Sequence, residues 1–138
     1  MKIIFLSPEF YADFAHCKEI LQKQNRPYAC LAIKIDGKVF AIPIRHRITH
    51  KYAFKTVGDC GLDYTKAVII LKASYISRTP ATINQKEYDL IKGKEAMIAN
   101  GMRRYVALYK KALQYPDAPH YQSILQYSSL GVFAKLLG

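Results

Sequence analysis

The chain has 138 residues, of which 51% are hydrophobic and 22% are charged, a composition typical of one globular domain. Either half alone would bury too little apolar surface, so we expect a single domain over residues 1–138. No apolar run approaches the roughly 18 residues that a membrane-spanning helix needs. The N-terminal run meets Ser7 and Pro8 too early for a signal peptide, which favours a cytoplasmic protein without membrane contact.

Basic residues outnumber acidic ones, since 21 Lys and Arg against 10 Asp and Glu give a formal net charge of +11. Two stretches, Gly37–Gly58 and Ala96–Pro116, contain several basic residues and no acidic one. A field of this sign attracts polyanions. The pattern predicts a nucleic acid partner. The alternative is a solvated basic surface that only keeps the protein soluble.

The first predicted elements are a strand and a helix. Apolar residues predict a strand over Lys2–Leu6. Ser7 can cap the orphan amides of a following helix, and Pro8 suits its first turn. We expect a helical region that runs to about Gln24 and ends at Arg26-Pro27, with a break near His16 as the alternative.

A hairpin is the clearest local signal. The apolar runs Tyr28–Ile35 and Lys38–Ile42 flank the dipeptide Asp36-Gly37, which is a preferred two-residue hairpin loop. Both arms are apolar on both faces, so the hairpin should lie centrally in a sheet. Pro43 has no amide hydrogen to donate, and regular pairing should weaken there.

One more strand is predicted in the second half, over Ala67–Lys72, and Ser74–Ser77 extends it in one interpretation. Strands precede helices along the chain. This order favours an α+β fold built on an antiparallel sheet.

Two helical regions complete the chain. A capping-box pattern at Thr82 opens the first, which Pro116 ends. Gly93 and Asn100-Gly101 are the places where this helix is expected to kink or split. An amphipathic helix fits Tyr121–Leu137.

The segment after the hairpin, IPIRHRITHKY, concentrates reactive side chains. Cleavage of RNA without a metal needs a base for the ribose 2′-hydroxyl, an acid for the leaving 5′-oxygen and cations for the phosphorane. His46 and His50 suit the first two roles, because imidazole titrates near neutral pH. Arg45 and Arg47 suit the third, because a guanidinium matches phosphate oxygens.

The spacing of the two histidines leaves alternatives open. In an extended segment His46 and His50 lie roughly 13 Å apart, too far to flank one phosphate. A turn brings them within about 6 Å. One histidine acting with a residue from another element is therefore an equal hypothesis. In the structural interpretation, His46 is a polar strand residue and His50 a packing residue.

A metal or cofactor site is disfavoured. The zinc-protease pattern needs Glu directly after the first histidine of His46-x-x-x-His50, and Arg47 stands there instead. The three cysteines show no Cys-x-x-Cys spacing, which disfavours a zinc cage or a disulfide framework. No phosphate-binding glycine loop or nucleophile elbow is present. We expect neither metal nor cofactor.

A second cluster precedes the later strand. Lys66 can steady a phosphate, Thr65 can hydrogen-bond one, and Tyr64 can stack on a base. The alternative is an ordinary loop with a turn at Asp63. Further RNA-binding candidates are Arg26, Tyr28, Arg47, Lys51 and Lys55, together with a helical stripe of Arg103, Arg104, Lys110 and Lys111.

The hairpin and its sequel resemble a known family. YACLAIKIDGKVFAIPIR, followed by His50 and then by GLDYTKA, is similar to the toxins of type III toxin–antitoxin systems, in the TenpN group of the ToxN/AbiQ-like endoribonucleases. The resemblance covers roughly residues 26–72. ToxN-type relatives have hydroxyl residues and a Lys where Arg45, His46 and Arg47 stand here, so it leaves the base unassigned. Lys66 matches a basic position of the family.

The resemblance implies a twisted antiparallel sheet, related to small barrel-like RNase toxins, with flanking helices. It also implies metal-independent cleavage that leaves a 2′,3′-cyclic phosphate. The partners would be cellular RNA and a small repeat RNA that inhibits the toxin in a closed protein–RNA assembly. We therefore predict an endoribonuclease with His50 or His46 as base or acid and with Arg45 and Lys66 stabilising the phosphorane. These side chains are expected to meet in a single exposed cationic hollow. The alternatives are a non-catalytic RNA-binding module and an enzyme for a small anionic metabolite.

Overall fold

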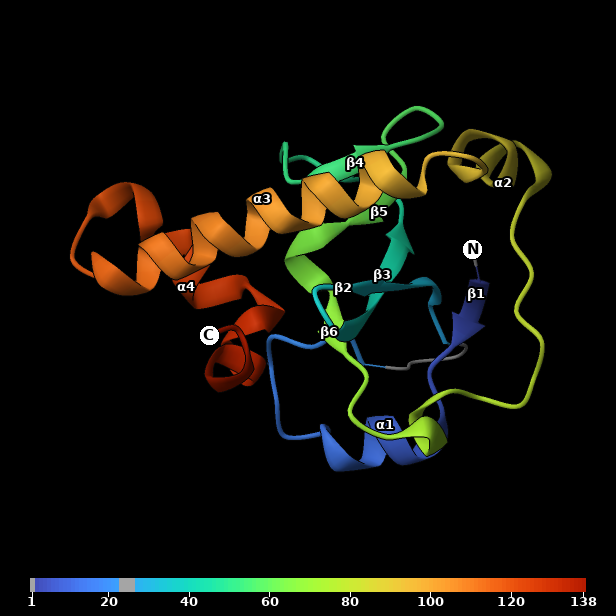
Figure 1. Cartoon of the computed structure of the whole chain (residues 1–138), viewed down its shortest axis with the longest axis horizontal. Coiled ribbons are helices and arrows are strands. Elements are labelled where there is room, and N and C mark those ends of the chain that lie inside the picture. The colour runs from blue at the N-terminus through green and yellow to red at the C-terminus, as the bar shows by residue number, and fades with distance from the viewer. Residues whose placement is uncertain (1, 23–26) are drawn as a thin grey trace.

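A computed structural model describes residues 2–22 and 27–138 and has the predicted α+β fold (Figure 1). Its six-stranded antiparallel sheet has the order β1-β2-β3-β5-β4, and β6 pairs with β3 beside this path. In the described part of the chain the sheet stays open, so the expected barrel-like closure is wrong. The strands are β1 (Lys2–Phe5), β2 (Ala29–Ile35), β3 (Lys38–Arg45), β4 (Ala53–Lys55), β5 (Gly61–Asp63) and β6 (Val68–Ile69).

Helices and short 3-10 turns surround the sheet, with α3 across one side and α1 at the opposite end of the view (Figure 1). No helix within residues 2–22 and 27–138 is long and apolar enough to cross a membrane. The α-helices are α1 (Pro8–Asp13), α2 (Gln85–Ile91), α3 (Glu95–Gln114) and α4 (Gln122–Tyr127). The 3-10 helices are η1 (Tyr64–Lys66), η2 (Ala73–Tyr75), η3 (Pro119–Tyr121) and η4 (Ser129–Leu136).

The hairpin of β2 and β3 forms as predicted. After Pro43, β3 no longer pairs with β2 and pairs with β5 instead. Asp36 and Gly37 have φ of 51° and 83°, the left-handed conformation that a tight two-residue turn requires. The β2 ladder ends at the pair Cys30–Pro43. β3 nevertheless continues to Arg45, because β5 pairs with its last two residues.

The strand β5 lies between β3 and β4 and needs its glycine. A Cβ atom at Gly61 would lie 2.4 Å from the Phe54 carbonyl oxygen of β4, a contact that backbone cannot relieve. On its other edge β5 pairs with the end of β3, and the Arg45 side chain reaches Asp63 at the end of β5. The candidate site is built there.

The first helix is shorter than predicted. Ser7 caps it, since its side-chain oxygen accepts from the Phe10 amide at 3.3 Å, but α1 ends at Asp13. The Gln22 side chain instead donates to three carbonyls of the following turns, which gives residues 14–22 an irregular path. The predicted binding residue Arg26 lies outside the described residues.

The later elements follow the glycine signals only in part. Gly93, with φ of 77°, separates α2 from α3 as expected. The Asn100-Gly101 pair does not split α3. A Cβ at Gly101 would lie 2.2 Å from the Tyr64 hydroxyl, so this glycine makes room for the tyrosine ring. The strand over Ala67–Lys72 shrinks to β6, and η2 replaces its extension. The single helix over Tyr121–Leu137 is three short helices.

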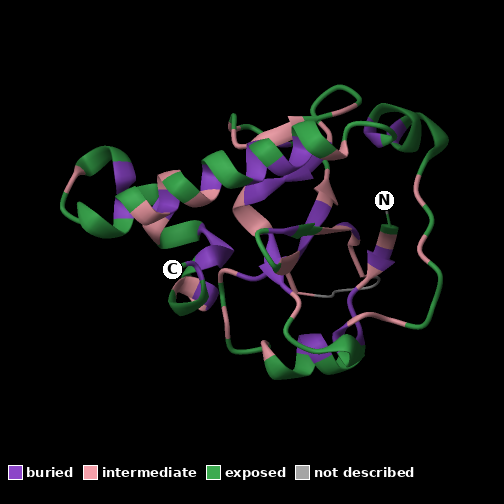
Figure 2. Cartoon of the chain, in the orientation of Figure 1, coloured by how far each residue is buried: buried purple, intermediate pink, exposed green. Residues whose placement is uncertain are grey.

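The core lies between α3 and the sheet (Figure 2). α3 presents a buried face to the sheet and an exposed face to solvent. Its buried residues recur at helical spacing and are Ile98, Ala99, Gly101, Met102, Tyr105, Tyr109 and Ala112. Because this helix contacts β2, β4 and η1, it supports the sheet behind the candidate site.

Buried tyrosines should make the fold sensitive to alkali. Burial raises the pKa of Tyr64 and of Tyr105 to about 12, and a hydrogen bond to Asp13 does the same for Tyr75. Because the folded pKa exceeds the unfolded value of about 10, this stabilisation is complete below pH 10 and lost as the pH rises towards 12.

We expect the urea midpoint of unfolding to fall steeply between pH 10 and 12, as measured by circular dichroism at a series of pH values. Tyr105→Phe should make this fall shallower, whereas Tyr115→Phe at an exposed position should not change it. If the urea midpoint fell equally steeply with pH in wild type and in Tyr105→Phe, the attribution of this fall to buried Tyr105 would be wrong.

Candidate active site

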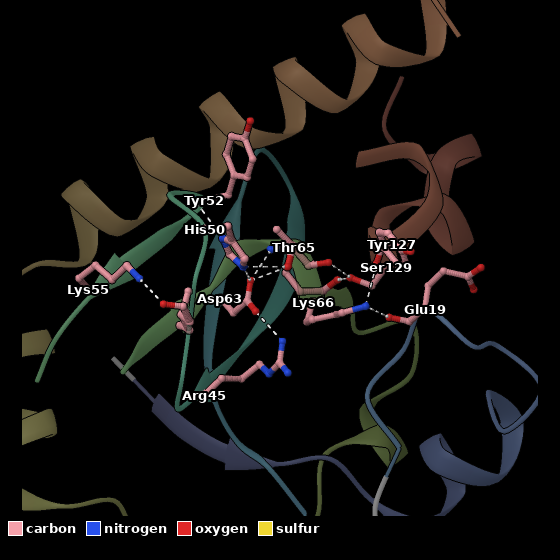
Figure 3. Close-up of polar contacts among 12 residues, drawn as sticks. Glu19, Arg45, His50, Tyr52, Lys55, Asp63, Thr65, Lys66, Tyr127 and Ser129 are labelled. Carbon is pink, nitrogen blue, oxygen red and sulfur yellow. Dashed lines mark hydrogen bonds and ion pairs between the residues drawn. The ribbon is translucent and has the colours of Figure 1, made fainter. Parts of the chain in front are cut away.

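Asp63 is the centre of a polar network at the end of β5 (Figure 3). Its side chain is fully buried. Arg45 Nη1 lies 2.8 Å from its Oδ2 atom, while the Thr65 amide and the Thr65 hydroxyl donate to Oδ1 at 2.9 and 2.6 Å. A buried carboxylate is stable only when it is paired and hydrogen-bonded, and both conditions hold here.

His50 contacts the same carboxylate, and both of its ring nitrogens are occupied. Nε2 lies 3.2 Å from Asp63 Oδ1, and Nδ1 accepts from the Tyr52 amide at 3.0 Å. The amide contact assigns Nδ1 as the unprotonated nitrogen, so Nε2 carries the hydrogen that points at Asp63. In this arrangement His50 orients Asp63 and has no free nitrogen for a substrate proton.

Lys66 joins three segments instead of lining an open hollow. Its Nζ atom donates to the Glu19 carbonyl at 2.9 Å and to the Tyr127 carbonyl at 2.7 Å (Figure 3). Burial, and then the charge of Arg45, lower the pKa of the ammonium group. Its cationic charge lies beside the Asp63 network, but two of its three hydrogens are used by backbone carbonyls.

His46 lies in a different environment from Arg45, because neighbouring strand residues point to opposite faces. Arg45 points to Asp63, while Ile44 and His46 line a groove of about 900 Å³ with Tyr28 and Glu87. His46 is exposed to solvent. The groove therefore holds the histidine that a substrate can reach.

A thiol orients the His46 ring. His46 Nδ1 lies 2.9 Å from Cys60 Sγ, and that sulfur lies 3.8 Å from Asp59 Oδ1. Burial, followed by the acidic Glu87 and Asp59, raises the pKa of Cys60, so the group stays a thiol at neutral pH. A thiol that donates to Asp59 accepts the Nδ1 hydrogen of His46. The Nε2 atom of His46 then keeps its lone pair.

The structure thus divides the four predicted catalytic residues into two groups. Arg45, His50 and Lys66 gather around Asp63, as Figure 3 shows, whereas His46 pairs with Cys60 and faces the groove. The single hollow expected from the sequence is therefore wrong. A strand delivers consecutive side chains to opposite faces, and this separates Arg45 from His46.

Two predicted RNA contacts from the second cluster are corrected. Tyr64 is 6% exposed and lies under α3, where its hydroxyl donates to the Ile98 carbonyl at 3.0 Å, so its ring cannot stack on a base. The Thr65 hydroxyl donates to Asp63 instead of facing solvent.

The other predicted contacts line the surface near the site or on α3. Arg47 and Lys51 are exposed, and Lys51 lies 5.7 Å from the centre of the Tyr52 ring. Lys55 is also exposed and donates to the Ile48 carbonyl at 3.1 Å. The α3 stripe consists of exposed Arg103, Arg104 and Lys111 and half-buried Lys110.

The stripe on α3 borders two hollows. Arg103 and Lys110 line one of about 220 Å³, where Arg103 lies 3.4 Å from Asp36. Arg104 and Lys51 line another of about 390 Å³. Both hollows lie along the flanks of α3, where the helix meets the sheet, and basic side chains border each of them.

Sequence reasoning missed three acidic or sulfur-containing members of the site. The sequence pattern predicts a turn at Asp63, although an acid followed by Thr at the second position is also a local capping signal. Cys60 and Glu87 carry no signal of their own. Cys60 reaches His46 only through the pairing of β3 with β5, and Glu87 reaches the groove only through the placement of α2.

Comparison of the chain with models of protein families, with curated proteins and with solved structures gives no match in any of the three. Across residues 2–22 and 27–138, no three His, Cys, Asp or Glu side chains gather in a way that could hold a metal ion.

Proposed function

We propose that the protein is an endoribonuclease that cleaves RNA without a metal ion. One observation carries the proposal. The segment after β3 places an imidazole with an available nitrogen, His46, in the large groove, directly before the exposed guanidinium of Arg47. The contact with Cys60 orients the imidazole before substrate binds.

The cleavage step assigns one role to each group. His46 Nε2 takes the proton of a ribose 2′-hydroxyl, and the freed oxygen attacks the adjacent phosphorus. The bond to the 5′-oxygen breaks as the new bond forms, which leaves a 2′,3′-cyclic phosphate. The open groove lets solvent protonate the leaving oxygen.

Arg47 stabilises the charge that develops on the phosphorane. It follows His46 directly and is exposed, and a guanidinium offers five N–H donors to phosphate oxygens. Arg45 points to the opposite face from His46, where it pairs with Asp63, and therefore takes no part in the cleavage step. His50 and Lys66 hydrogen-bond within and beside the same Asp63 network and support the fold.

Charge and the family resemblance together support the biological setting. The net charge of +11 and the exposed Arg47, Lys51 and α3 stripe suit an RNA backbone. We propose a cytoplasmic toxin of a type III toxin–antitoxin system, inhibited by a small repeat RNA in a closed protein–RNA assembly. Its other partner is cellular RNA.

The test is cleavage of a single-stranded RNA by purified protein in the presence of EDTA. We expect fragments that end in a 2′,3′-cyclic phosphate, detected by mass spectrometry, because no step uses a metal. Loss of cleavage in EDTA, or fragments with a free 3′-hydroxyl, would refute the mechanism. Tight RNA binding without any fragments would favour the alternative of a non-catalytic RNA-binding module on the same surface.

A further inference from the structure

Glu87 is a buried acid in a groove of a strongly basic protein. It is 7% exposed, and its Oε2 atom is buried without a hydrogen-bond partner among residues 2–22 and 27–138. A buried carboxylate oxygen without a hydrogen-bond donor destabilises the fold. The carboxylate also repels the phosphates that the surrounding positive charge attracts. A ligand that donates a hydrogen bond to this oxygen would satisfy it.

The surroundings of Glu87 suit a flat aromatic ligand. The same groove of about 900 Å³ is lined by Phe5, Tyr28 and Ile44, which supply apolar and aromatic surface. Single-stranded RNA is recognised by stacking of splayed bases on aromatic side chains and by hydrogen bonds to their Watson–Crick edges. Tyr28 offers such a ring in the groove that also contains His46.

Asn84 is a second polar side chain in the groove. Asn84 caps α2 with its Oδ1 atom, which accepts from the Lys86 amide at 2.8 Å. Its NH₂ group is left to donate. The groove therefore combines a carboxylate acceptor with an amide donor, three residues apart along the chain.

We propose that this groove selects guanine and that Glu87 is the residue that determines the selection. Guanine presents two adjacent donors, N1–H and N2–H, to a carboxylate and presents O6 to an amide donor such as Asn84. Adenine and cytosine place a ring nitrogen lone pair against the carboxylate, and uracil offers one donor between two acceptors. The inference rests on the proposed function for its RNA substrate, and it predicts cleavage next to guanosine.

The test measures binding alone, so it does not depend on cleavage. The probes are fluorescent 2′-O-methyl oligouridines that carry one central guanosine, adenosine, cytidine or inosine and cannot be cut. For wild-type protein, fluorescence anisotropy should give about tenfold tighter binding with guanosine than with adenosine or cytidine. Inosine lacks the N2 amino group and should bind about fivefold more weakly than guanosine.

Variants assign the preference to Glu87. In Glu87→Gln the preference for guanosine over adenosine should fall below twofold, and inosine should bind as well as guanosine. Asp89→Asn removes the same charge from an exposed position of the same helix and should keep the wild-type order. Because the inosine comparison uses wild-type protein, it stands even if Glu87→Gln fails to fold.

The outcomes separate this inference from the proposed function. Equal binding of all four probes by wild-type protein, or an unchanged guanosine preference in Glu87→Gln, overturns the guanine pocket. If guanosine is preferred but no RNA is cut, the pocket is supported and the nuclease proposal fails. If RNA is cut without any guanosine preference, the nuclease proposal is supported and the guanine pocket fails.

Discussion

Replacing His46 with alanine is expected to lower the RNA cleavage rate by about 10²–10⁴-fold, the usual contribution of a general base. The reason is that His46 faces the groove with an available Nε2, whereas both nitrogens of His50 are occupied by Asp63 and Tyr52. The measurement is the single-turnover cleavage of a labelled RNA. RNA affinity should change by less than about threefold, since the imidazole is one of many contacts.

Two further variants make this prediction specific. His16→Ala removes an exposed imidazole from the turn after α1 and should keep the wild-type rate. Cys60→Ala removes the thiol that orients His46 and should lower the rate by less than His46→Ala does. Full activity of His46→Ala would disprove its role as the base. Complete loss in His50→Ala with a native fold would return that role to His50.

Replacing Asp63 with alanine is expected to lower the free energy of unfolding by about 3 kcal/mol. The change leaves the Thr65 amide without its acceptor and removes the counter-charge of Arg45 and the partner of His50. Arg45 and His50 are each about one-third exposed, and water therefore compensates part of the loss. Chemical denaturation with urea measures the change.

Controls for Asp63 distinguish charge from hydrogen bonding. Asp63→Asn keeps an oxygen for the Thr65 amide and should cost less than Asp63→Ala, although it loses the ion pair. Asp117→Ala, at an exposed position, should stay within about 0.5 kcal/mol of wild type. A loss below 1 kcal/mol in Asp63→Ala would show that this network does not stabilise the fold.

Local chemistry explains which parts of the fold were predictable. The hairpin formed because Asp36-Gly37 tolerates positive φ, and α1 began where Ser7 and Pro8 place a cap. The division at Gly93 follows from the same backbone freedom. Each signal depends on residues that are neighbours in the chain. For this reason the class of the fold and the hairpin that precedes the candidate site were visible in the sequence.

Long-range contacts explain what was not predictable. Gly101 makes room for the ring of Tyr64, which lies far away in sequence. The strand β6 is short because only two of its residues pair with β3. Whether the sheet closes into a barrel likewise depends on which strands pair with one another. Local propensity cannot contain this information.

By itself, the sequence of this protein determined a basic α+β domain with Arg45, His46 and His50 just after one hairpin and with Lys66 in a second cluster before a later strand. The tertiary structure decided how these side chains are used. Strand alternation turned Arg45 towards Asp63 and His46 towards the groove, while Cys60 and Glu87 arrived from other elements. Residue types and local spacing are encoded along the chain, but the face on which a side chain emerges and the partner that it meets depend on strand pairing and helix packing.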